Sequence, residues 1–391
     1  MELITAKCVN NALTLFASGR LDTINASLAD ELMTKYCEEY NVENVILDAE
    51  KLEYISSTGL RSILKLRKNK PNLKIVNVTS EIYDIFEMTG FSEMIPIEKA
   101  YRKMSVDGCE IIGKGAKGTV YRYNSDTVIK VFNDSNILPA IHRERELARK
   151  AFVLDIPTAI SYDVVKVGDQ YGSVFELLDT QSYSNLIKSH PENLEKYVKD
   201  YTDLIKLIHN TQVKEDDMPD GKNIVYSWLN STDKLLPADI GAKIRKLIDE
   251  IPDTLNMLHC DYHTNNIMCQ NGETILIDMD TLSHGHPIIE LANIFVTYVG
   301  FIEMDPKNVE NFLGFSSDIA LKFWDLFMPL YFETEDKEKL KEYEDKISLL
   351  GYCRVISHII KRKPIEECKE QIDNFITKIT TLAKSIDTLN F

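Results

Sequence analysis

Three side chains that could carry out phosphoryl chemistry lie close together in the chain: Asp261, Asn266 and Asp278. The apolar runs around them predict short buried strands, which would hold the polar loop between them rigid. Asp261 has the chemistry of a base that accepts a proton from an attacking hydroxyl. Asn266 and Asp278 offer the hard oxygen ligands that Mg²⁺ prefers, and the metal in turn neutralises nucleotide phosphates. The spacing therefore predicts a phosphoryl-transfer centre in which Asp261 is catalytic and Asn266 and Asp278 bind the metal.

A glycine-rich stretch precedes this centre in the chain. Gly113, Gly115 and Gly118 form the pattern G-x-G-x-x-G. A dinucleotide-binding loop needs a helix after its last glycine, but residues 119–123 are β-branched and aromatic, which favours a strand. We therefore predict the turn of a β-hairpin, in which glycine lets the backbone approach phosphates closely. Taken alone, the pattern favours an ordinary hairpin turn, but the neighbouring residues favour a phosphate-binding turn.

A single lysine, Lys130, interrupts an otherwise apolar strand predicted over residues 127–132. A buried ammonium needs an anion nearby. The predicted helix over residues 142–154 offers Glu144 and Glu146, but only Glu144 shares a face with the apolar residues of that helix. The pattern predicts that Glu144 pairs with Lys130. An edge-strand lysine without a functional partner is the alternative.

Together these motifs resemble the aminoglycoside phosphotransferase and choline kinase-like family, the small-molecule branch of the kinase-like fold. The resemblance rests on the catalytic and metal-binding segments, His259-x-Asp261-x-His263-x-x-Asn266 and Ile277-Asp278-x-Asp280. Eukaryotic protein kinases place Lys two residues after the catalytic Asp, where this chain has His263. The family fold is α+β and bilobal, with a β-rich small lobe and a helical large lobe.

The resemblance implies several further roles. ATP or GTP would bind with Mg²⁺ under the glycine loop, and Lys130 would contact its α- and β-phosphates. The backbone of a hinge from Glu176 to Leu178 would meet the base. Glu290 resembles the acidic residue that supports the catalytic loop in this family.

Three positions depart from the family pattern. Cys260 and Asn265 occupy positions where glycine is usual, and His286 stands where a Gly-Asp-Pro turn would have Asp. Asn tolerates the left-handed backbone that a glycine position often demands, so we expect the catalytic loop to form.

The segment after Asp280 is informative because it is short. Only residues 281–289 separate the metal segment from the next predicted helix. This interval leaves no room for a long activation loop or a platform for a protein substrate. It favours a small-molecule hydroxyl acceptor, and the helical remainder of the chain should include the surface that binds it.

The first hundred residues form a separate α/β unit. Strands are predicted over residues 12–17, 44–48 and 73–78, and helices over 27–40, 58–67 and 81–89. The segments 19–26, 54–60 and 88–91 resemble the anti-sigma-factor antagonist (STAS) family across almost the whole unit. This resemblance implies a switch domain that binds a protein partner.

Ser57 aligns with the serine that a partner kinase phosphorylates in those antagonists. It precedes a predicted helix, whose N-terminal amides and dipole would favour an added phosphate. Family members usually carry Asp just before that serine, where this chain has Ser56. The alternative is that Ser56 and Ser57 simply cap the helix.

Length and composition frame these assignments. The 391 residues predict two or three domains: a STAS-like domain (1–100), a kinase-like small lobe (101–180) and a helical large lobe (181–391). A formal charge of −16 argues against binding to nucleic acid or to an anionic membrane surface. Seven scattered cysteines suit reduced thiols, and no segment resembles a signal peptide or membrane span, so we expect a cytoplasmic protein.

Two functions follow from this organisation. The first is a nucleotide- and Mg²⁺-dependent phosphotransferase that acts on a small-molecule hydroxyl and is regulated or localised by the STAS-like domain. The second is a signalling protein whose STAS-like domain binds a regulator. In that case the kinase-like domain would sense nucleotide or phosphorylate a protein, with Ser57 as one candidate target.

Overall fold

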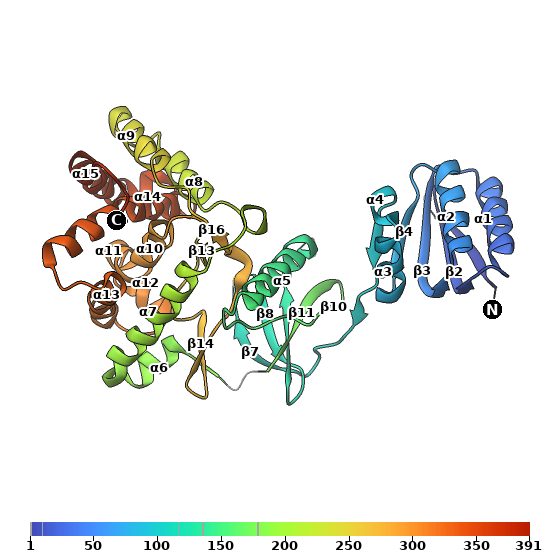
Figure 1. Cartoon of the computed structure of the whole chain (residues 1–391), viewed down its shortest axis with the longest axis horizontal. Helices are drawn as coiled ribbons and strands as arrows, with labels where there is room; N and C mark the ends of the chain where they lie inside the picture. The colour runs from blue at the N-terminus through green and yellow to red at the C-terminus, as the bar shows by residue number, and fades with distance from the viewer. Residues whose placement is uncertain (1, 10, 116, 135–136, 178–179) are drawn as a thin grey trace. The chain divides into compact units, whose positions relative to one another are not determined.

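The structure is a computed structural model that describes residues 2–9, 11–115, 117–134, 137–177 and 180–391. It forms two compact units, one of residues 1–105 with 164–168 and the other of residues 106–163 with 169–391. Figure 1 shows the helices and strands of each unit. Within the described residues, no helix is both long enough and apolar enough to cross a membrane.

The first unit is an α/β domain built on a five-stranded sheet. The strand order is β1-β2-β3-β4-β5, with β1 antiparallel to β2 and the remaining neighbours parallel. Its elements are β1 (Ile4–Val9), β2 (Ala12–Leu21), α1 (Ala26–Tyr40), β3 (Asn44–Ile55), α2 (Ser57–Asn69), β4 (Lys74–Val78), α3 (Ser80–Met88), α4 (Phe91–Met94) and β5 (Ile97–Lys99). Every strand and helix predicted for this unit is present, which confirms the α/β assignment.

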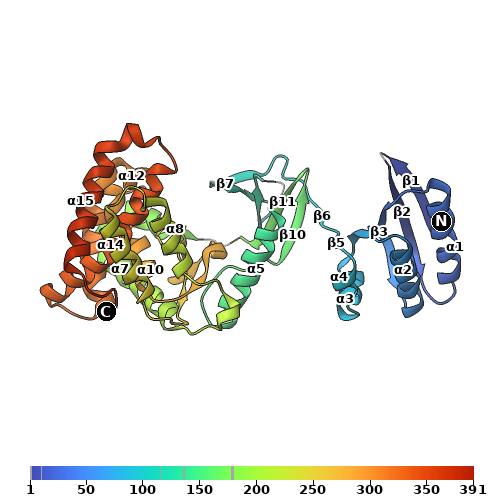
Figure 2. The same cartoon turned by 90° about the horizontal axis from the view of Figure 1, so that it is seen from above.

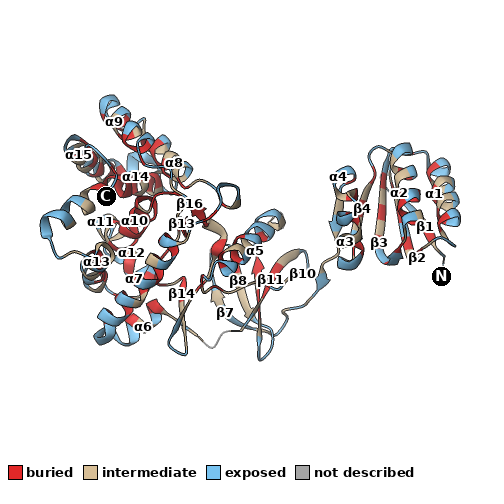
Figure 3. Ribbon diagram, viewed as in Figure 1, coloured by how far each residue is buried: buried red, intermediate tan, exposed pale blue. Residues whose placement is uncertain are grey.

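The apolar side chains of this sheet and its helices form one core. Leu13, Leu15, Leu47 and Ile75 are fully buried. The buried residues follow the strands and one stripe of each helix (Figure 3). The period of two along the strands and 3.6 along the helices is what made these elements recognisable in the sequence.

The second unit begins with an antiparallel sheet. Strands β7 (Glu110–Lys114) and β8 (Gly118–Arg122) form a hairpin, and β8 continues to β9 (Thr127–Phe132), which pairs with β11 (Gln170–Glu176). Helix α5 (Leu138–Val153) follows β9. The predicted hairpin turn at the glycine loop is therefore confirmed. Strand β10 (Asp163–Val167) pairs in parallel with β6 (Arg102–Lys103), which groups residues 164–168 with the first unit.

The rest of the second unit is mainly helical. The helices are α6 (Tyr183–Ser189), α7 (Leu194–Asn210), α8 (Lys222–Thr232), α9 (Ala238–Asp249), α10 (Ile288–Phe295), α11 (Phe301–Met304), α12 (Lys307–Leu313), α13 (Ser317–Phe332), α14 (Lys337–Ile360) and α15 (Lys369–Ser385). A π-helical turn, η4 (Val296–Gly300), joins α10 to α11. Helix α14 packs against α10, α8 and α15 (Figures 1 and 2). A β-rich part followed by a helical part confirms the bilobal α+β prediction.

One glycine of the hairpin is required by packing. A Cβ atom at Gly118 would lie 2.3 Å from the carbonyl oxygen of Val131 on the neighbouring strand. A Cβ at Gly115 would have no neighbour closer than 3.9 Å. Gly118 thus lets β8 approach β9 closely, and β9 is the strand that carries Lys130.

We predict that Gly118→Ala loosens the β8–β9 pairing. Relief of the backbone overlap should cost about 1–3 kcal/mol. Amide hydrogen exchange in β8 and β9 should then become roughly fivefold faster or more, because local opening costs less free energy. Gly115→Ala is the matched control and should leave the exchange rates unchanged. Equal rates in the two variants would contradict this account.

Candidate active site

The catalytic segment is a loop between short strands. It leaves β13 (Met257–Leu258) and enters β14 (Ile267–Gln270), which pairs with β15 (Glu273–Leu276). Ile267 lies opposite Leu276, and the Ile277 amide donates to the Asn266 carbonyl at 2.9 Å. Asn266 and Asp278 therefore leave the same end of one hairpin. The apolar strands recognised in the sequence are what bring these two side chains together.

Asp261 lies directly beside Asn266. The Asn266 side-chain amide donates to the Asp261 carbonyl oxygen at 3.0 Å and to its carboxylate at 3.4 Å. His263 Nε2 lies 3.6 Å from the same carboxylate. Burial opposes ionisation of Asp261, but the hydrogen bond and charge of His263 outweigh it, and its pKa falls well below the usual range. Asp261 is therefore a carboxylate at neutral pH.

Lys130 joins three elements of the site. Its ammonium lies 3.3 Å from Glu144 Oε1 on α5 and 2.9 Å from Asp278 Oδ1. Burial opposes its charge, but the two carboxylates outweigh that effect and raise the pKa of Lys130. Burial raises the pKa of Glu144, whereas the charge of Lys130 overcomes burial at Asp278 and lowers its pKa. Glu146, the other acid considered from the sequence, instead pairs with Lys150 at 3.1 Å.

The glycine loop contributes a cation that sequence reasoning missed. Lys117 forms an ion pair with Asp280, two residues beyond Asp278. Burial opposes its charge, but the hydrogen bond that the Lys117 ammonium donates to Asp280, together with the Asp280 charge, outweighs burial and raises the pKa of Lys117. Gly113 lies in β7, Gly115 in the turn and Gly118 at the start of β8. The ion pair thus ties the hairpin turn to the segment that contains Asp278 and Asp280.

Glu290, in α10, supports the loop that contains Asp261. Its fully buried carboxylate accepts hydrogen bonds from the backbone amides of His259 at 2.8 Å and Cys260 at 2.6 Å. His209 Nε2 lies 3.1 Å from the same carboxylate. The role that the resemblance implied for Glu290 thus has a direct geometric basis. His209 in α7 was not identified from the sequence, because no local pattern connects it to residue 290.

The catalytic loop differs in one respect from the sequence expectation. Cys260 adopts the left-handed conformation, with φ of +63°. Asn265 is not among the described residues with positive φ, so the argument that asparagine tolerates this backbone was wrong for that position. The hydrogen bond that the Cys260 backbone amide donates to the Glu290 carboxylate holds the unusual conformation at the cysteine. Asn265 instead donates its side-chain amide to the Phe312 carbonyl at 2.7 Å.

Further hydrogen bonds make the loop a rigid scaffold. The hydroxyls of Tyr201 and Tyr262 donate to each other's backbone carbonyls at 3.1 and 2.7 Å. Thr281 donates to the His259 carbonyl at 2.7 Å. At His286, the imidazole Nδ1 accepts from the Ile288 amide at 3.2 Å, so this side chain caps the start of α10.

The remaining candidate residues lie elsewhere. Glu176 is the exposed last residue of β11, opposite Thr127, whereas Leu178 lies outside the described residues. The hinge assignment therefore stays a prediction.

Ser57 is the exposed first residue of α2 in the first unit. The cap of α2 is Ser56, whose hydroxyl accepts from the Gly59 amide at 3.4 Å. Only one of the two serines that we considered as caps has that function.

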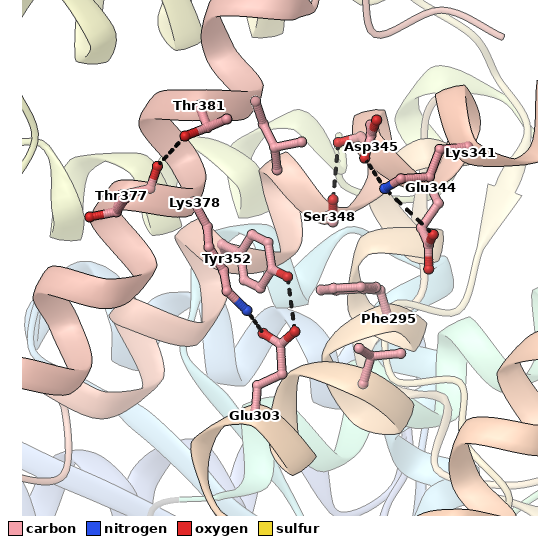
Figure 4. Close-up of a pocket in the computed structure, with 12 residues that line it drawn as sticks. Phe295, Glu303, Lys341, Glu344, Asp345, Ser348, Tyr352, Thr377, Lys378 and Thr381 are labelled. Atoms are coloured by element: carbon pink, nitrogen blue, oxygen red, sulfur yellow. Dashed lines mark hydrogen bonds and ion pairs between the residues drawn. The ribbon is translucent and has the colours of Figure 1, made fainter. Parts of the chain in front are cut away.

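A cavity of about 450 Å³ lies between α10, α14 and α15. None of the candidate site residues lines it. Inside it, Glu303 pairs with Lys378 at 2.8 Å and accepts from the Tyr352 hydroxyl at 3.1 Å (Figure 4). This cavity is distinct from the site formed by Asp261, Asn266 and Asp278.

The fold and the site define a phosphotransferase of the kinase-like type preceded by a STAS-like domain. Residues 108–314 match the family model described as the phosphotransferase enzyme family, and the chain belongs to that family. Residues 4–104 match the STAS domain model. Both family resemblances stated from the sequence are thus confirmed.

Three similar proteins each match one part of this chain. The protein BtrV of Bordetella bronchiseptica, described as an anti-sigma factor antagonist, is 29% identical over 80 residues, which are 19% of this chain and 69% of BtrV. The ADP-bound crystal structure of aminoglycoside phosphotransferase APH(2'')-Ib has 14% identity and a TM-score of 0.48, covering 77% of this chain and 98% of that one. A Thermotoga maritima structure described as an anti-sigma factor antagonist has 19% identity and a TM-score of 0.23, covering 25% of this chain and 86% of that one.

We predict that Glu290→Gln destabilises the second unit. The substituted amide would direct a donor at the amide of His259 or Cys260 and leave buried groups unsatisfied, which costs about 1–3 kcal/mol. Both tryptophans of the chain, Trp228 and Trp324, lie in this unit, so urea unfolding followed by tryptophan fluorescence reports on it alone.

The matched control for this test is Glu310→Gln, which alters an exposed acid of α12 in the same unit. Its unfolding midpoint should stay at the wild-type value. A Glu290→Gln midpoint that also equals the wild-type midpoint would show that Glu290 is not what holds the loop.

Proposed function

We propose that this protein is a nucleotide- and Mg²⁺-dependent phosphotransferase that moves the γ-phosphate of ATP or GTP to a hydroxyl of a small molecule. The observation that carries the proposal is the convergence of an ionised Asp261, Asn266 and a Lys130-bound Asp278 at one end of a β-hairpin. These groups come from separate parts of the chain. Phosphoryl transfer depends on such positioning and on fixed charge more than on covalent chemistry by the protein.

The small lobe supplies the nucleotide site in this proposal. The turn containing Gly113, Gly115 and Gly118 covers the phosphates, and Lys130 contacts them. Glu144 holds the Lys130 ammonium in place, since the two groups are 3.3 Å apart and both largely buried. The backbone from Glu176 to Leu178 meets the base.

Asn266 and Asp278 are suited to hold Mg²⁺. The Asn266 amide nitrogen is engaged with Asp261, which leaves its Oδ1 atom for a metal. Asp278 uses Oδ1 for Lys130, so its second carboxylate oxygen remains. Mg²⁺ is commonly bound by one or two such side chains together with phosphates and water, which matches a site with two protein ligands. When bound, the metal neutralises charge on the phosphates.

Asp261 orients the acceptor hydroxyl in this proposal. A carboxylate with a strongly lowered pKa is a weak base, so it accepts a hydrogen bond from the hydroxyl and takes the proton late, as the oxygen bonds to phosphorus. His263 and Asn266 hold the carboxylate during this step. The short connection from η3 (Met279–Thr281) to α10 favours a small acceptor.

The test of this proposal is Asp261→Asn in the full-length chain. Slow nucleotide hydrolysis with Mg²⁺, and turnover with a panel of hydroxyl compounds, should fall roughly 10²- to 10⁴-fold, the range for loss of a general base. Nucleotide affinity measured by calorimetry should change little, because Asp261 is placed on the acceptor side. The control is Asp325→Asn, which alters an exposed acid of α13.

Full hydrolysis and turnover in Asp261→Asn would refute the assigned role. Failure of wild-type protein to bind nucleotide would refute the phosphotransferase proposal itself.

The exposed position of Ser57 favours a second proposal, regulation through the first unit. Because Ser56 provides the helix cap, the Ser57 hydroxyl at the start of α2 makes no capping bond and can be modified. An added phosphate would gain from the helix N-terminus. The STAS-like domain would then bind or release a protein partner according to that modification.

If the kinase-like unit phosphorylates Ser57 of its own chain, we expect incubation with Mg²⁺ and ATP to yield a phosphorylated peptide that contains Ser57. Peptide mapping by mass spectrometry of wild type, Ser57→Ala and Ser56→Ala would show this. The peptide should persist in Ser56→Ala and disappear in Ser57→Ala. An unmodified Ser57 together with turnover of a small molecule would refute phosphorylation of Ser57 by the kinase-like unit of this chain.

A further inference from the structure

Arg354 is a partly buried cation without a polar partner among the described residues. It lies on α14, and its guanidinium carbon is 5.5 Å from the centroid of the Trp228 ring. Within the described part of the chain, Arg354 forms no ion pair and no hydrogen bond. Its nitrogens are also not among the fully buried polar atoms without a hydrogen bond, so they have some exposed surface. The guanidinium therefore presents donors to accessible space. A cation held in this way is a ready receptor for an anion.

Arg354 acts on the Asp261 carboxylate through its charge. Its positive charge is one of the influences that lower the pKa of Asp261, after those of His263 and His259. A series of ring contacts then links the catalytic loop to α14. The His263 ring centroid lies 4.9 Å from that of Phe312, and Phe312 lies 5.7 Å from Phe301.

The same series ends on α14, one turn beyond Arg354. The Phe301 ring lies 5.4 Å from His358, which is four residues after Arg354 and therefore on the same helix face. Burial, followed by the charges of Arg362, Arg354 and Lys361, lowers the pKa of His358 to about 4. The last turns of α14 and the residues just after them are thus positive and contact aromatic rings, although the whole chain carries a formal charge of −16.

The carboxylates of the nearby cavity belong to the other side of α14. Tyr352 precedes Arg354 by two residues and so points in a roughly opposite direction on the helix. In the cavity, Tyr352 contacts Glu303, and Lys378 neutralises that acid (Figure 4). Helix α14 therefore separates an acidic, internally paired cavity from a positive face that includes Arg354.

We propose that Arg354 binds an anionic group of the phosphate acceptor, so that the acceptor is a small hydroxyl compound carrying a carboxylate or phosphate group and a flat apolar part. This inference rests on the proposed function, because it assigns the acceptor for the same site. The flat part would pack against Phe301 and Phe312, while the hydroxyl meets Asp261. A planar guanidinium matches a carboxylate with two parallel hydrogen bonds. A polycationic acceptor would meet repulsion from Arg354.

The test uses three probes that share a benzyl alcohol core and carry an anionic, a neutral or a cationic para position: para-hydroxymethylbenzoate, para-hydroxymethylbenzamide and para-aminomethylbenzyl alcohol. Each is titrated into the full chain without nucleotide, with calorimetry and tryptophan fluorescence as readouts. The anionic probe should bind roughly tenfold or more tightly than the neutral one, as expected for a charge-assisted hydrogen bond. The cationic probe should bind most weakly.

Substitutions then locate the preference. Arg354→Gln should abolish the advantage of the anionic probe, and Arg354→Lys should keep part of it, because the charge remains but the two-pronged geometry is lost. Lys384→Gln removes one exposed charge from α15 in the same unit and should leave the preference intact. Thermal melting of each variant verifies that it is folded.

Equal binding of the anionic and neutral probes, no binding of the anionic probe, or an unchanged preference in folded Arg354→Gln would overturn the inference. Its failure is separable from failure of the proposed function. Arg354-dependent binding of the anionic probe without any phosphate transfer would refute the phosphotransferase while leaving the anion site. Phosphate transfer preferentially to neutral or cationic acceptors would refute the anion site while leaving the phosphotransferase proposal.

Discussion

The Lys130 ammonium is the interaction on which the site depends. Glu144 and Asp278 are largely buried carboxylates on different elements, and without a cation between them they would repel each other in a poorly hydrated space. Lys130 compensates both charges and thereby joins β9, α5 and the segment that contains Asp278. Removing one partner of such a group leaves an uncompensated buried charge, which is far more costly than losing an exposed ion pair. The same ion pairs therefore determine both the positions of these side chains and the charge balance of the site.

The catalytic loop meets a second constraint, because it must expose Asp261 on a backbone that turns sharply at Cys260. The left-handed conformation at a non-glycine residue is unfavourable by itself. It is held by the Glu290 carboxylate, which accepts hydrogen bonds from two loop amides. The hydrogen bonds between Tyr201 and Tyr262 stabilise the same loop. Buried Glu290 and His209 thus stabilise a loop conformation that carries the chemistry.

Much of this organisation could be predicted from the sequence. The signals for Asp261, Asn266 and Asp278 are local, since short spacing between apolar strands determines where these side chains emerge. The choice of Glu144 over Glu146 followed from helix periodicity alone. The contacts of Lys117, His209 and Arg354 could not be predicted, because each joins segments far apart in the chain and no periodic pattern marks them. The backbone at Cys260 and Asn265 was also beyond prediction, because hydrogen bonds to α10 and to Phe312 determine it.

The most direct test of the central claim is calorimetric titration of ATP with and without Mg²⁺, in wild-type protein and in Asp278→Ala. The account predicts that Mg²⁺ strengthens nucleotide binding in the wild type and that this gain disappears in Asp278→Ala, because the metal loses its carboxylate ligand. Binding that Mg²⁺ does not affect in the wild type would contradict the account. An equal Mg²⁺-dependent gain in Asp278→Ala would show that the metal ligands have been assigned to the wrong residues.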